Sequence, residues 1–277
     1  MPEQLAVLGL PISHSLSPRI HRAAYAQLGL PWRYSAVRCA AAELGTFLAG
    51  RGPEWRGLSV TMPLKEEAHR LARSLDPVAE SSGVVNTLAR RADGRGWDGY
   101  NTDVAGLAAA IRDAGLDAAR TLVIGTGATA VSAVLAAQQL GAAQLWVAGR
   151  RRTAAHAIAR RFGATDGIDL TDAELRRLPA TLVISTLPGP AGHQASIPAE
   201  LTAVPLFDVA YDPWPSPLAE RWRAAGGTAH PGTAMLIEQA IVQVRIFRSG
   251  DPTTLLPDES AVRAAMRGAT ASADMGR

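Results

Sequence analysis

The stretch TLVIGTGATAVSAVLAAQQL, residues 121–140, decides the fold of one part of this chain. A short apolar strand pattern leads into a turn with two glycines, Gly125 and Gly127, and an alanine-rich helical pattern follows. This order is typical of a dinucleotide-binding unit, because the glycines let the backbone approach a pyrophosphate and the helix N-terminus offers N–H groups to it. The alternative is a tight strand-to-helix turn without a ligand. The strand before the turn and the helix after it favour the nucleotide site.

Three arginines follow the next strand pattern, QLWVA at residues 144–148, after an intervening Gly149. A unit that binds NAD usually carries Asp or Glu at this strand end, where the carboxylate binds the ribose 2′-hydroxyl. Positive charge suits the 2′-phosphate of NADP instead, with Arg150 as the first candidate and Arg151 as the second. The alternative, a solvated basic face at a helix start, is reasonable for one or two of the three. Two later strand patterns, TLVIST and VPLFDVA, continue the unit.

The first hundred residues alternate short apolar strand patterns with helical ones, which predicts an α/β domain with a largely parallel sheet. Ser17 before Pro18 predicts a helix start with Ser17 as its cap. Residues 92–94 predict a hairpin turn. After Gly232 comes one long helical pattern, for which the first domain is a reasonable host. The last ten residues, GATASADMGR, predict a disordered tail.

Composition and charge describe an ordinary globular protein of two domains. The chain has 277 residues, 47% of them hydrophobic, and a net charge of +3 with acidic residues interspersed, so no nucleic acid partner is expected. The single cysteine, Cys39, can form no internal disulfide and no cysteine metal site, and no metal is expected. The first residues lack a basic leader and no apolar run reaches the roughly 18 residues that span a bilayer. We therefore expect no membrane partner and a cytoplasmic location.

Lys65 is the only lysine beside 27 arginines. A compositional bias that replaces lysine by arginine wherever a surface cation is enough would leave a lysine only where arginine cannot serve. The two side chains differ chemically, because a guanidinium stays protonated whereas an amine can exchange a proton near neutral pH. Chance survival of one lysine is the alternative. Pro63, two residues earlier, predicts that Lys65 lies in the first turn of a helix.

Six motifs in order along the chain resemble those of the shikimate dehydrogenase family: GLPISHSLSPRIH, SVTMPLK, VVNTL, GYNTDVAGL, the GxGxxA turn and GTAMLIEQA. The resemblance runs from about residue 5 to residue 250. It implies a two-domain α/β fold, in which an N-terminal α/β substrate domain, completed by C-terminal helices, holds an inserted Rossmann-like NADP-binding domain. Residues 1–103 and 232–277 are expected to form the substrate domain, and residues 104–231 the cofactor domain.

The resemblance also implies an activity: the reversible NADP-dependent reduction of 3-dehydroshikimate to shikimate, a step of chorismate and aromatic amino acid biosynthesis. Ser13 and Ser15 are expected to hold the substrate carboxylate, and from the residues alone ordinary turn and cap serines are the alternative. The rest of the substrate shell is expected to be Thr61, Lys65, Asn86, Asp103, Tyr211 and Gln239. The cofactor is expected to contact Gly125, Thr126, Gly127, Ala128, Thr129, Arg150, Arg151, Thr186 and Gly232.

Lys65 and Asp103 are the expected catalytic pair. Lys65 would deliver a proton to the C3 oxygen as hydride arrives from the nicotinamide, and Asp103 would orient the lysine and bind hydroxyl groups. Asp103 also opens a helical pattern, so it can be a helix N-terminal carboxylate stabilised by the helix dipole, which is compatible with catalysis.

The chain departs from the family pattern at several positions. Ser59 and Arg22 each stand where asparagine is usual. In the nucleotide unit, Ala128 and Thr129 replace a second glycine and a small residue, and Gly149 replaces a frequent asparagine. These departures leave open a quinate/shikimate dehydrogenase that uses NAD or NADP. A rival in a different class, a non-catalytic NADP-binding sensor, would be favoured if Lys65 or Asp103 were missing, and both are present. The expected partner is a small-molecule substrate, and the expected state is a monomer or homodimer.

Overall fold

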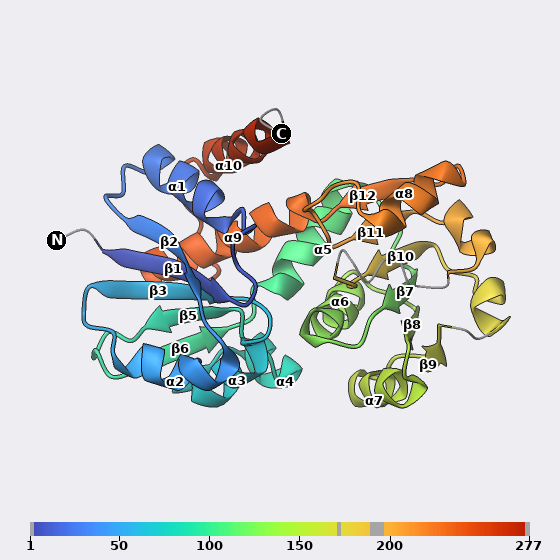
Figure 1. Ribbon diagram of the computed structural model, residues 1–277, viewed down its shortest axis with the longest axis horizontal. Coiled ribbons are helices and arrows are strands. Elements are labelled where there is room, and N and C mark those ends of the chain that lie inside the picture. The colour runs from blue at the N-terminus through green and yellow to red at the C-terminus, as the bar shows by residue number, and fades with distance from the viewer. Residues whose placement is uncertain (1–2, 171–172, 189–196, 275–277) are drawn as a thin grey trace. The chain divides into compact units, whose positions relative to one another are not determined.

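The chain folds into two compact units (Figure 1). The computed structural model describes residues 3–170, 173–188 and 197–274. The first unit comprises Met1–Thr102 and Leu236–Arg277, and the second comprises Asp103–Met235. This division assigns Asp103 and residues 232–235 to the second unit, whereas the sequence analysis divided the chain after Asp103 and before Gly232.

The first unit contains a mixed sheet with the strand order β2-β1-β3-β5-β6-β4. Its strands are β1 (Gln4–Gly9), β2 (Arg33–Arg38), β3 (Trp55–Val60), β4 (Ser74–Leu75), β5 (Thr87–Arg90) and β6 (Trp97–Tyr100). β1 pairs in parallel with β2 and β3, as the alternation of patterns predicted, and β4 pairs in parallel with β6. β5 is antiparallel to β3 and β6, because the predicted turn folds β5 and β6 into a hairpin. The sheet is therefore mixed rather than largely parallel.

Helices cover both faces of this sheet (Figure 1). One face carries α1 (Ser17–Gln27), α9 (Thr233–Ser249) and α10 (Glu259–Asp274), and the other carries α2 (Ala41–Ala49), α3 (Lys65–Leu71) and α4 (Pro77–Ser82). Side chains of β1 alternate between the faces, as in any strand covered on both sides. Leu5 and Val7 join the core under α1 and α9, while Ala6 and Leu8 join the core under α2 and α3.

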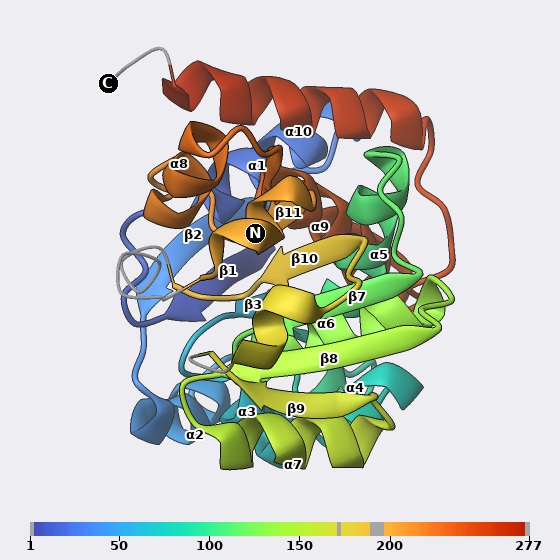
Figure 2. The ribbon, with the colours of Figure 1, turned by 90° about the vertical axis from the view of Figure 1, so that its right-hand side faces the viewer.

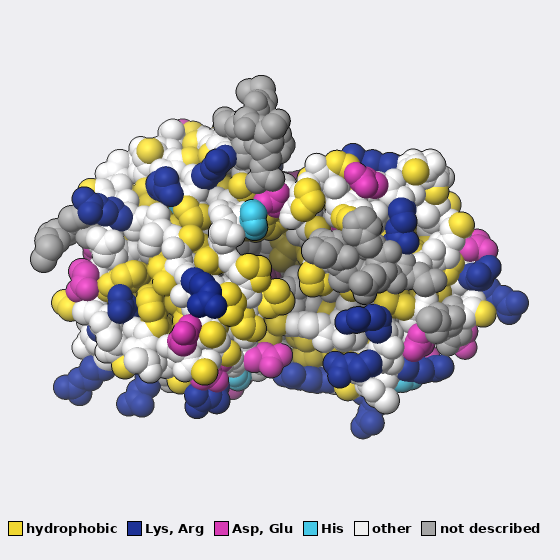
Figure 3. All heavy atoms as spheres, viewed as in Figure 1, with side chains coloured by type: hydrophobic (Ala, Val, Ile, Leu, Met, Phe, Trp, Pro, Cys, Tyr) yellow, Lys and Arg dark blue, Asp and Glu magenta, His cyan; other side chains and the backbone are white. Residues whose placement is uncertain are grey.

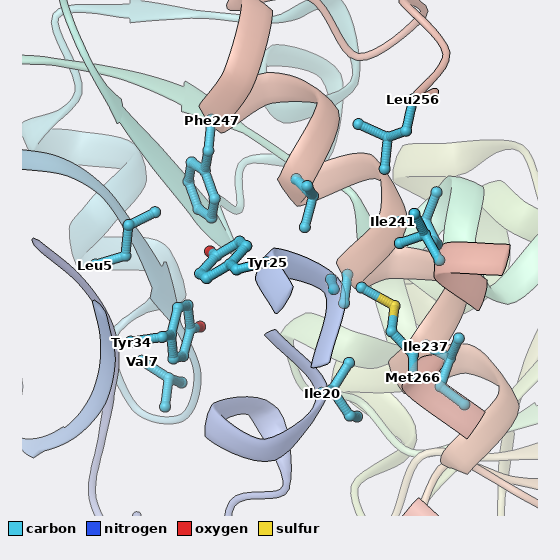
Figure 4. Close-up of a cluster of buried hydrophobic side chains, with 14 residues drawn as sticks. Leu5, Val7, Ile20, Tyr25, Tyr34, Ile237, Ile241, Phe247, Leu256 and Met266 are labelled. Carbon is cyan, nitrogen blue, oxygen red and sulfur yellow. The ribbon is translucent and has the colours of Figure 1, made fainter. Parts of the chain in front are cut away.

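The long helix α9 has its host in the first unit, as predicted. Figure 4 shows the core in which Ile237, Ile241 and Phe247 of α9 lie with Tyr25 of α1 and Tyr34 of β2. This packing fixes the course of the part of α9 that carries Gln239 and, one turn later, Gln243.

Two local predictions are wrong. Ser17 is the first residue of α1 rather than its cap; Leu16 is the cap residue, and Ser15 Oγ accepts a hydrogen bond from Ser17 N at 3.3 Å. A disordered tail is contradicted as far as Asp274, where α10 ends. The reason is tertiary packing, since Val262 and Met266 of α10 are fully buried against the core of the first unit.

The second unit contains a wholly parallel sheet with the order β12-β11-β10-β7-β8-β9 (Figure 2). Its strands are β7 (Arg120–Ile124), β8 (Gln144–Gly149), β9 (Asp166–Asp169), β10 (Leu182–Ser185), β11 (Leu206–Asp208) and β12 (Ala229–Pro231). Its helices are α5 (Asp103–Asp113), α6 (Ala128–Gln139), α7 (Arg152–Phe162) and α8 (Pro217–Ala224), with short 3-10 helices at Ala173–Arg177 and Ala199–Ala203. Counted from β7 as strand 1, the order is 3-2-1-4-5-6, which is that of Rossmann dinucleotide-binding sheets. The predicted two-unit α/β fold is confirmed.

Candidate active site

Candidate residues of the first unit gather at one edge of its sheet. Because β1 and β3 are parallel, the loops that follow them leave the sheet at the same edge. The exposed Ser13 and the partly buried Ser15 lie in the loop after β1, and Thr61 and Lys65 follow β3. β5 runs in the opposite direction, so Asn86, the residue before it, lies at this edge too.

The segments after β1 and β3 are in direct contact. Thr61 N donates a hydrogen bond to Leu8 O at 2.9 Å. A Cβ on Gly9, the last residue of β1, would lie 2.4 Å from Thr61 Cγ2. The Thr61 side chain therefore packs on the end of β1, where the loop with the two candidate serines begins.

Lys65 is the first residue of α3, as Pro63 predicted. Its carbonyl oxygen accepts a hydrogen bond from Val85 N at 3.0 Å. Asn86, which follows Val85, accepts a hydrogen bond from Val60 N at 2.7 Å through its own carbonyl oxygen. Lys65 and Asn86 therefore lie on adjacent backbone segments at the sheet edge.

Three buried polar side chains form a hydrogen-bonded cluster there. Asn86 Nδ2 donates to Thr102 Oγ1 at 2.9 Å and to Gln239 Oε1 at 3.4 Å. Thr102 N donates to Asn86 Oδ1 at 2.9 Å. The structure thus brings together two predicted substrate residues that are 153 positions apart in the chain. The sequence analysis missed Thr102, although it directly precedes the predicted Asp103.

A second buried polar group continues from Asn86. Thr87 Oγ1 donates to Asn86 Oδ1 at 2.8 Å, and Gln243 Nε2 donates to Thr87 Oγ1 at 2.9 Å. His21 Nε2 lies 3.1 Å from Gln243 Oε1. Burial lowers the pKa of His21 from 6.5 to about 3, and the hydrogen bond to Gln243 opposes that shift only in part. His21 is therefore neutral at physiological pH.

Sequence reasoning missed Thr87, Gln243 and His21 as parts of the site. The signal that could have found Gln243 is its spacing of four residues from Gln239, which places two glutamines on one face of the helix. His21 ends the motif GLPISHSLSPRIH, but its contact with Gln243 joins residues 222 positions apart.

The glycine turn of the second unit joins β7 to α6, as predicted. β7 lies beside β10 at the point where the strand order reverses, the place where doubly wound sheets bind ligands. Gly125 has a φ of +126°, and a Cβ there would lie 2.1 Å from Thr186 Oγ1. Thr186 follows β10, and its hydroxyl donates to Ile124 O at 3.0 Å. Only glycine fits at position 125.

Gly127 differs from Gly125, because its surroundings leave room for a side chain. Its φ is −94°, and apart from its chain neighbours no heavy atom lies within 4 Å of a Cβ placed there. Gly127 is the cap residue of α6, so an anion bound at this helix start would occupy that room. Ala130, one turn into α6, is fully buried, which allows close packing of the helix. The turn with its neighbours Thr126, Ala128 and Thr129 thus fits a pyrophosphate.

Arg150 and Arg151 are exposed just after β8, as predicted. Gly149 before them has a close neighbour, since a Cβ there would lie 2.5 Å from Thr126 Cγ2. Gly149 and Thr126 therefore fit each other, which accounts for a glycine at this position. Two exposed guanidinium groups at the end of the second strand of this sheet suit a phosphate on the adenosine ribose.

The remaining candidates lie in the second unit. Asp103 is buried and is the first residue of α5, as its sequence pattern indicated. Gly232 N donates to Ala210 O at 3.1 Å, next to the partly buried Tyr211. A Cβ on Gly232 would lie 2.1 Å from Val209 O, so the two segments approach as closely as only glycine permits.

Some kinds of site are not found in the described part of the chain. Among residues 3–170, 173–188 and 197–274, no group of three or more His, Cys, Asp or Glu side chains could hold a metal ion. None of the helices described combines the length and apolar character needed to cross a bilayer. Cationic and anionic side chains are interspersed over the face that Figure 3 shows.

The doubly wound parallel sheet with its glycine turn, carried in one chain with a mixed α/β unit, defines a two-unit protein of the Rossmann dinucleotide-binding class. A family model for the shikimate dehydrogenase substrate binding domain matches residues 7–88. The shikimate dehydrogenase (NADP(+)) of Anaeromyxobacter dehalogenans is 35% identical over 257 residues, which cover 89% of this chain and 90% of that protein. The chain therefore belongs to the shikimate dehydrogenase family, and the resemblance of its motifs is confirmed.

Solved structures agree with this assignment. The shikimate dehydrogenase of Mycobacterium tuberculosis is 38% identical, with a TM-score of 0.84, and the match covers 98% of this chain and 100% of that one. The shikimate 5-dehydrogenase of Thermus thermophilus, solved in complex with NADP(H) and shikimate, is 30% identical with a TM-score of 0.82. That match covers 96% of this chain and 99% of the other.

Proposed function

We propose that this chain is an NADP-dependent shikimate dehydrogenase, an oxidoreductase that reversibly reduces 3-dehydroshikimate to shikimate in chorismate and aromatic amino acid biosynthesis. The observation that carries the proposal is the cluster of Asn86, Thr102 and Gln239 at the sheet edge where Lys65 begins α3, in a chain of this family. The cluster offers amide and hydroxyl groups, which suit a polyhydroxylated ring, and the lysine offers an amine.

The first unit, with residues 1–102 and 236–277, is proposed to bind the substrate. Ser13 and Ser15 bind the carboxylate through hydroxyl groups on the loop after β1. Thr61, Asn86 and Gln239 bind the ring hydroxyl groups from the neighbouring segments, and Asp103 and Tyr211 complete the set. The support for Thr61 is its contact with the end of β1, which keeps its segment beside the serine loop.

Lys65 is proposed to move the proton of the reaction. When the substrate carbonyl is reduced, Lys65 gives a proton to the C3 oxygen; in the reverse direction it takes that proton from the hydroxyl group. Asp103 orients the lysine and binds a hydroxyl group of the ring. NADPH, when bound, supplies the hydride. An arginine in place of Lys65 would keep the charge but could not exchange the proton.

The second unit is proposed to hold NADP. Gly125, Thr126, Gly127, Ala128 and Thr129 bind the pyrophosphate at the start of α6, with Thr186 beside the turn and Gly232 beside Val209. Arg150 and Arg151 bind the 2′-phosphate of the adenosine ribose. The absence of an acidic residue directly after β8 in the sequence supports NADP over NAD.

Comparing four substrate and cofactor pairs tests the function. We expect kcat/KM for shikimate with NADP to exceed the value for shikimate with NAD by about tenfold or more, as two phosphate contacts imply. We also expect shikimate to be preferred over quinate with either cofactor. A clear preference for NAD would refute the role of Arg150 and Arg151. A preference for quinate would favour the quinate/shikimate alternative. NADPH binding without turnover of any of these acids would favour the sensor.

Gly127→Ala tests the cofactor site without disturbing the fold. The structure has room for the added methyl group, so the unfolding temperature should stay within about 1 °C of the wild-type value. If the pyrophosphate lies against this turn, the same methyl group obstructs it, and KM for NADP should rise about tenfold or more. Gly268→Ala in α10, where a methyl group also has room, is the control outside the turn and should keep the wild-type KM for NADP. An unchanged KM for NADP in Gly127→Ala would contradict the proposed cofactor position.

The proposal also covers the cellular location and the oligomeric state of the protein. We propose a cytoplasmic enzyme that acts on a small-molecule substrate as a monomer or homodimer. The support is the family's biosynthetic role and a surface on which charges of both signs are interspersed (Figure 3).

A further inference from the structure

We propose that Thr87 and Gln243 are positioning residues of the substrate site, because together they fix the orientation of the Asn86 side-chain amide. The inference rests on the proposed function, in which Asn86 binds the substrate ring. Thr87 and Gln243 are buried, and the hydrogen bonds from Gln243 to Thr87 and from Thr87 to Asn86 lead to the Asn86 amide, so we assign both a role through Asn86 rather than on the substrate.

The orientation of the Gln243 side-chain amide follows from a neighbouring atom that can only accept a hydrogen bond. The backbone oxygen of Asn86 can only accept, and Gln243 Nε2 lies 3.5 Å from it. The amide nitrogen of Gln243 therefore faces β5, where it donates to Thr87 Oγ1 at 2.9 Å. The amide oxygen faces the other side, where Ser59 Oγ donates to it at 2.7 Å. His21 Nε2 is the second donor to that oxygen, at 3.1 Å.

The Thr87 hydroxyl group links the amide nitrogen of Gln243 to the side-chain oxygen of Asn86. A hydroxyl group has one proton, and because Thr87 Oγ1 accepts from Gln243, the proton is available to Asn86 Oδ1 at 2.8 Å. The other acceptor in reach, Thr102 Oγ1, is farther away at 3.5 Å. Thr102 N is a second donor to Asn86 Oδ1, at 2.9 Å. The oxygen of Asn86 is thus held on the side of these two donors.

The nitrogen of Asn86 consequently points to the side where the candidate substrate residues lie. Gln239 Oε1 accepts from it at 3.4 Å. Asn86 Nδ2 has two N–H groups: one donates to Thr102 Oγ1 at 2.9 Å, and the other, 3.4 Å from Gln239 Oε1, is the one proposed to meet a substrate oxygen. A donor suits a ring hydroxyl or carbonyl oxygen, and a rotated amide would present its own oxygen there instead.

Tyr34 closes the chain of hydrogen bonds at its far end. Tyr34 OH donates a hydrogen bond to Ser59 Oγ at 2.7 Å, and the Ser59 hydroxyl group donates in turn to Gln243 Oε1. Both side chains are buried, at 4% and 5% exposed. Three side chains separate Tyr34 from Asn86, so a change at Tyr34 weakens the network without touching the amide of Asn86. Tyr34 therefore offers a matched control.

The experiment compares Thr87→Val with Thr87→Ser and Tyr34→Phe in the full-length enzyme. Valine has nearly the volume of threonine but no hydroxyl group, whereas serine keeps the hydroxyl group. We expect Thr87→Val to raise KM for shikimate about tenfold, the value of one hydrogen bond, with KM for NADP unchanged and kcat changed less than KM. Thr87→Ser should restore KM to within about threefold of wild type. Tyr34→Phe should lower the unfolding temperature but leave KM for shikimate unchanged.

Each outcome decides whether Thr87 positions the Asn86 amide or only stabilises the buried core. A wild-type KM for shikimate in Thr87→Val overturns the inference. An equal rise in KM in Tyr34→Phe overturns it too, because the rise would then follow from general loosening of the core rather than from the Thr87 hydroxyl group. If Thr87→Val does not fold, Thr87→Ala removes the same hydroxyl group without adding a methyl group, and the same expectations apply to it. A wild-type enzyme that does not turn over shikimate overturns the proposed function and this inference together. Turnover by the wild type with an unchanged KM in Thr87→Val overturns the inference alone.

Discussion

Lys65→Ala is expected to lower kcat about a thousandfold, the range that a positioned acid or base contributes, while the dissociation constant for NADPH stays within about twofold of wild type. The reason is that Lys65 stands at the start of α3, with its backbone bonded to Val85 beside Asn86, whereas the proposed cofactor residues lie in the second unit. Steady-state kinetics give kcat, and titration of NADPH fluorescence gives the dissociation constant.

Lys65→Arg separates charge from proton transfer. Arginine keeps the positive charge, but its guanidinium does not release a proton at working pH. If the proton role is right, the arginine variant should lose nearly as much turnover as the alanine variant, and small primary amines in the buffer should partly restore the activity of Lys65→Ala. Glu66→Gln, a change at the next and exposed residue, is the control and should keep wild-type turnover. Turnover near the wild-type rate in Lys65→Arg would reduce the role of Lys65 to electrostatics.

The parts of the fold that the sequence predicted are those fixed by short stretches of chain. The turn at Gly125 and Gly127 needs a strand before it and a helix after it, and all of these lie within 20 residues. The same holds for the hairpin of β5 and β6, whose turn residues are adjacent in the chain. Local chemistry decides such elements, so a reading along the chain is enough.

One wrong prediction concerns an element that distant contacts decide, and the other concerns which nearby serine supplies a side-chain oxygen at the start of α1. The alanine-rich end of the chain resembles a tail by composition, but Val262 and Met266 bury themselves in the core of the first unit and hold α10 together to Asp274. At the start of α1, Ser17 fits the pattern of a cap, yet Ser15 provides the side-chain oxygen.

The site shows the same division. Asn86 and Gln239 were predicted from motifs, and the structure brings them to hydrogen-bonding distance. The contact between the groups that orient Asn86 could not be read from the sequence, since Gln243 reaches Thr87 across 156 positions. Ser59, noted in the sequence only as a departure from the family pattern, turns out to link Tyr34 to Gln243. A departure can therefore be part of a network whose other members are visible only in the fold.

Acid should destabilise the protein from about pH 6.5 downward, and His21 is the main cause. The His21 ring is fully buried and stacks on Tyr34 with ring centroids 4.0 Å apart. Its neutral form suits its neighbours, because Nε2 can donate to Gln243 Oε1 while Nδ1 accepts from Tyr25 OH at 3.0 Å. A second proton on the ring would face the Tyr25 hydroxyl and place an unpaired charge in the core.

The direction of the effect follows from proton binding. Below pH 6.5 the unfolded chain protonates His21, but the folded protein does not until about pH 3, so the unfolded state binds more protons between these values. The free energy of unfolding therefore rises with pH in this window and falls on acidification, with a limiting slope of about 1.4 kcal/mol per pH unit. Between about pH 7.5 and pH 5 the loss should be about 2 kcal/mol.

Glu259 does not contribute to the loss of stability expected between pH 7.5 and pH 5. Burial opposes ionisation of Glu259, but its hydrogen bonds from Arg245 and Leu256 outweigh burial and hold the pKa of its carboxyl below the usual 4.5. Its contribution to stability is present above pH 4.5 and is lost only as the pH falls through the lowered folded-state pKa. Losses between pH 7.5 and pH 5 thus belong to histidines rather than to this carboxylate: mainly to His21, and in smaller part to His230, whose pKa burial and then the charge of Arg223 also lower.

The variant His21→Gln, whose side chain cannot titrate, separates the pH dependence of stability from the loss of packing that the substitution causes. The variant should be less stable than wild type at about pH 7.5, since it loses the stack on Tyr34, but its free energy of unfolding should fall by less than about 1 kcal/mol on acidification to pH 5, the remainder coming from His230. His14→Gln, at an exposed position, should keep the full wild-type loss. Urea unfolding at the two pH values measures both quantities. A loss of about 2 kcal/mol that persists in His21→Gln would mean that another group protonates on unfolding, and that the buried imidazole does not set the acid limit of this fold.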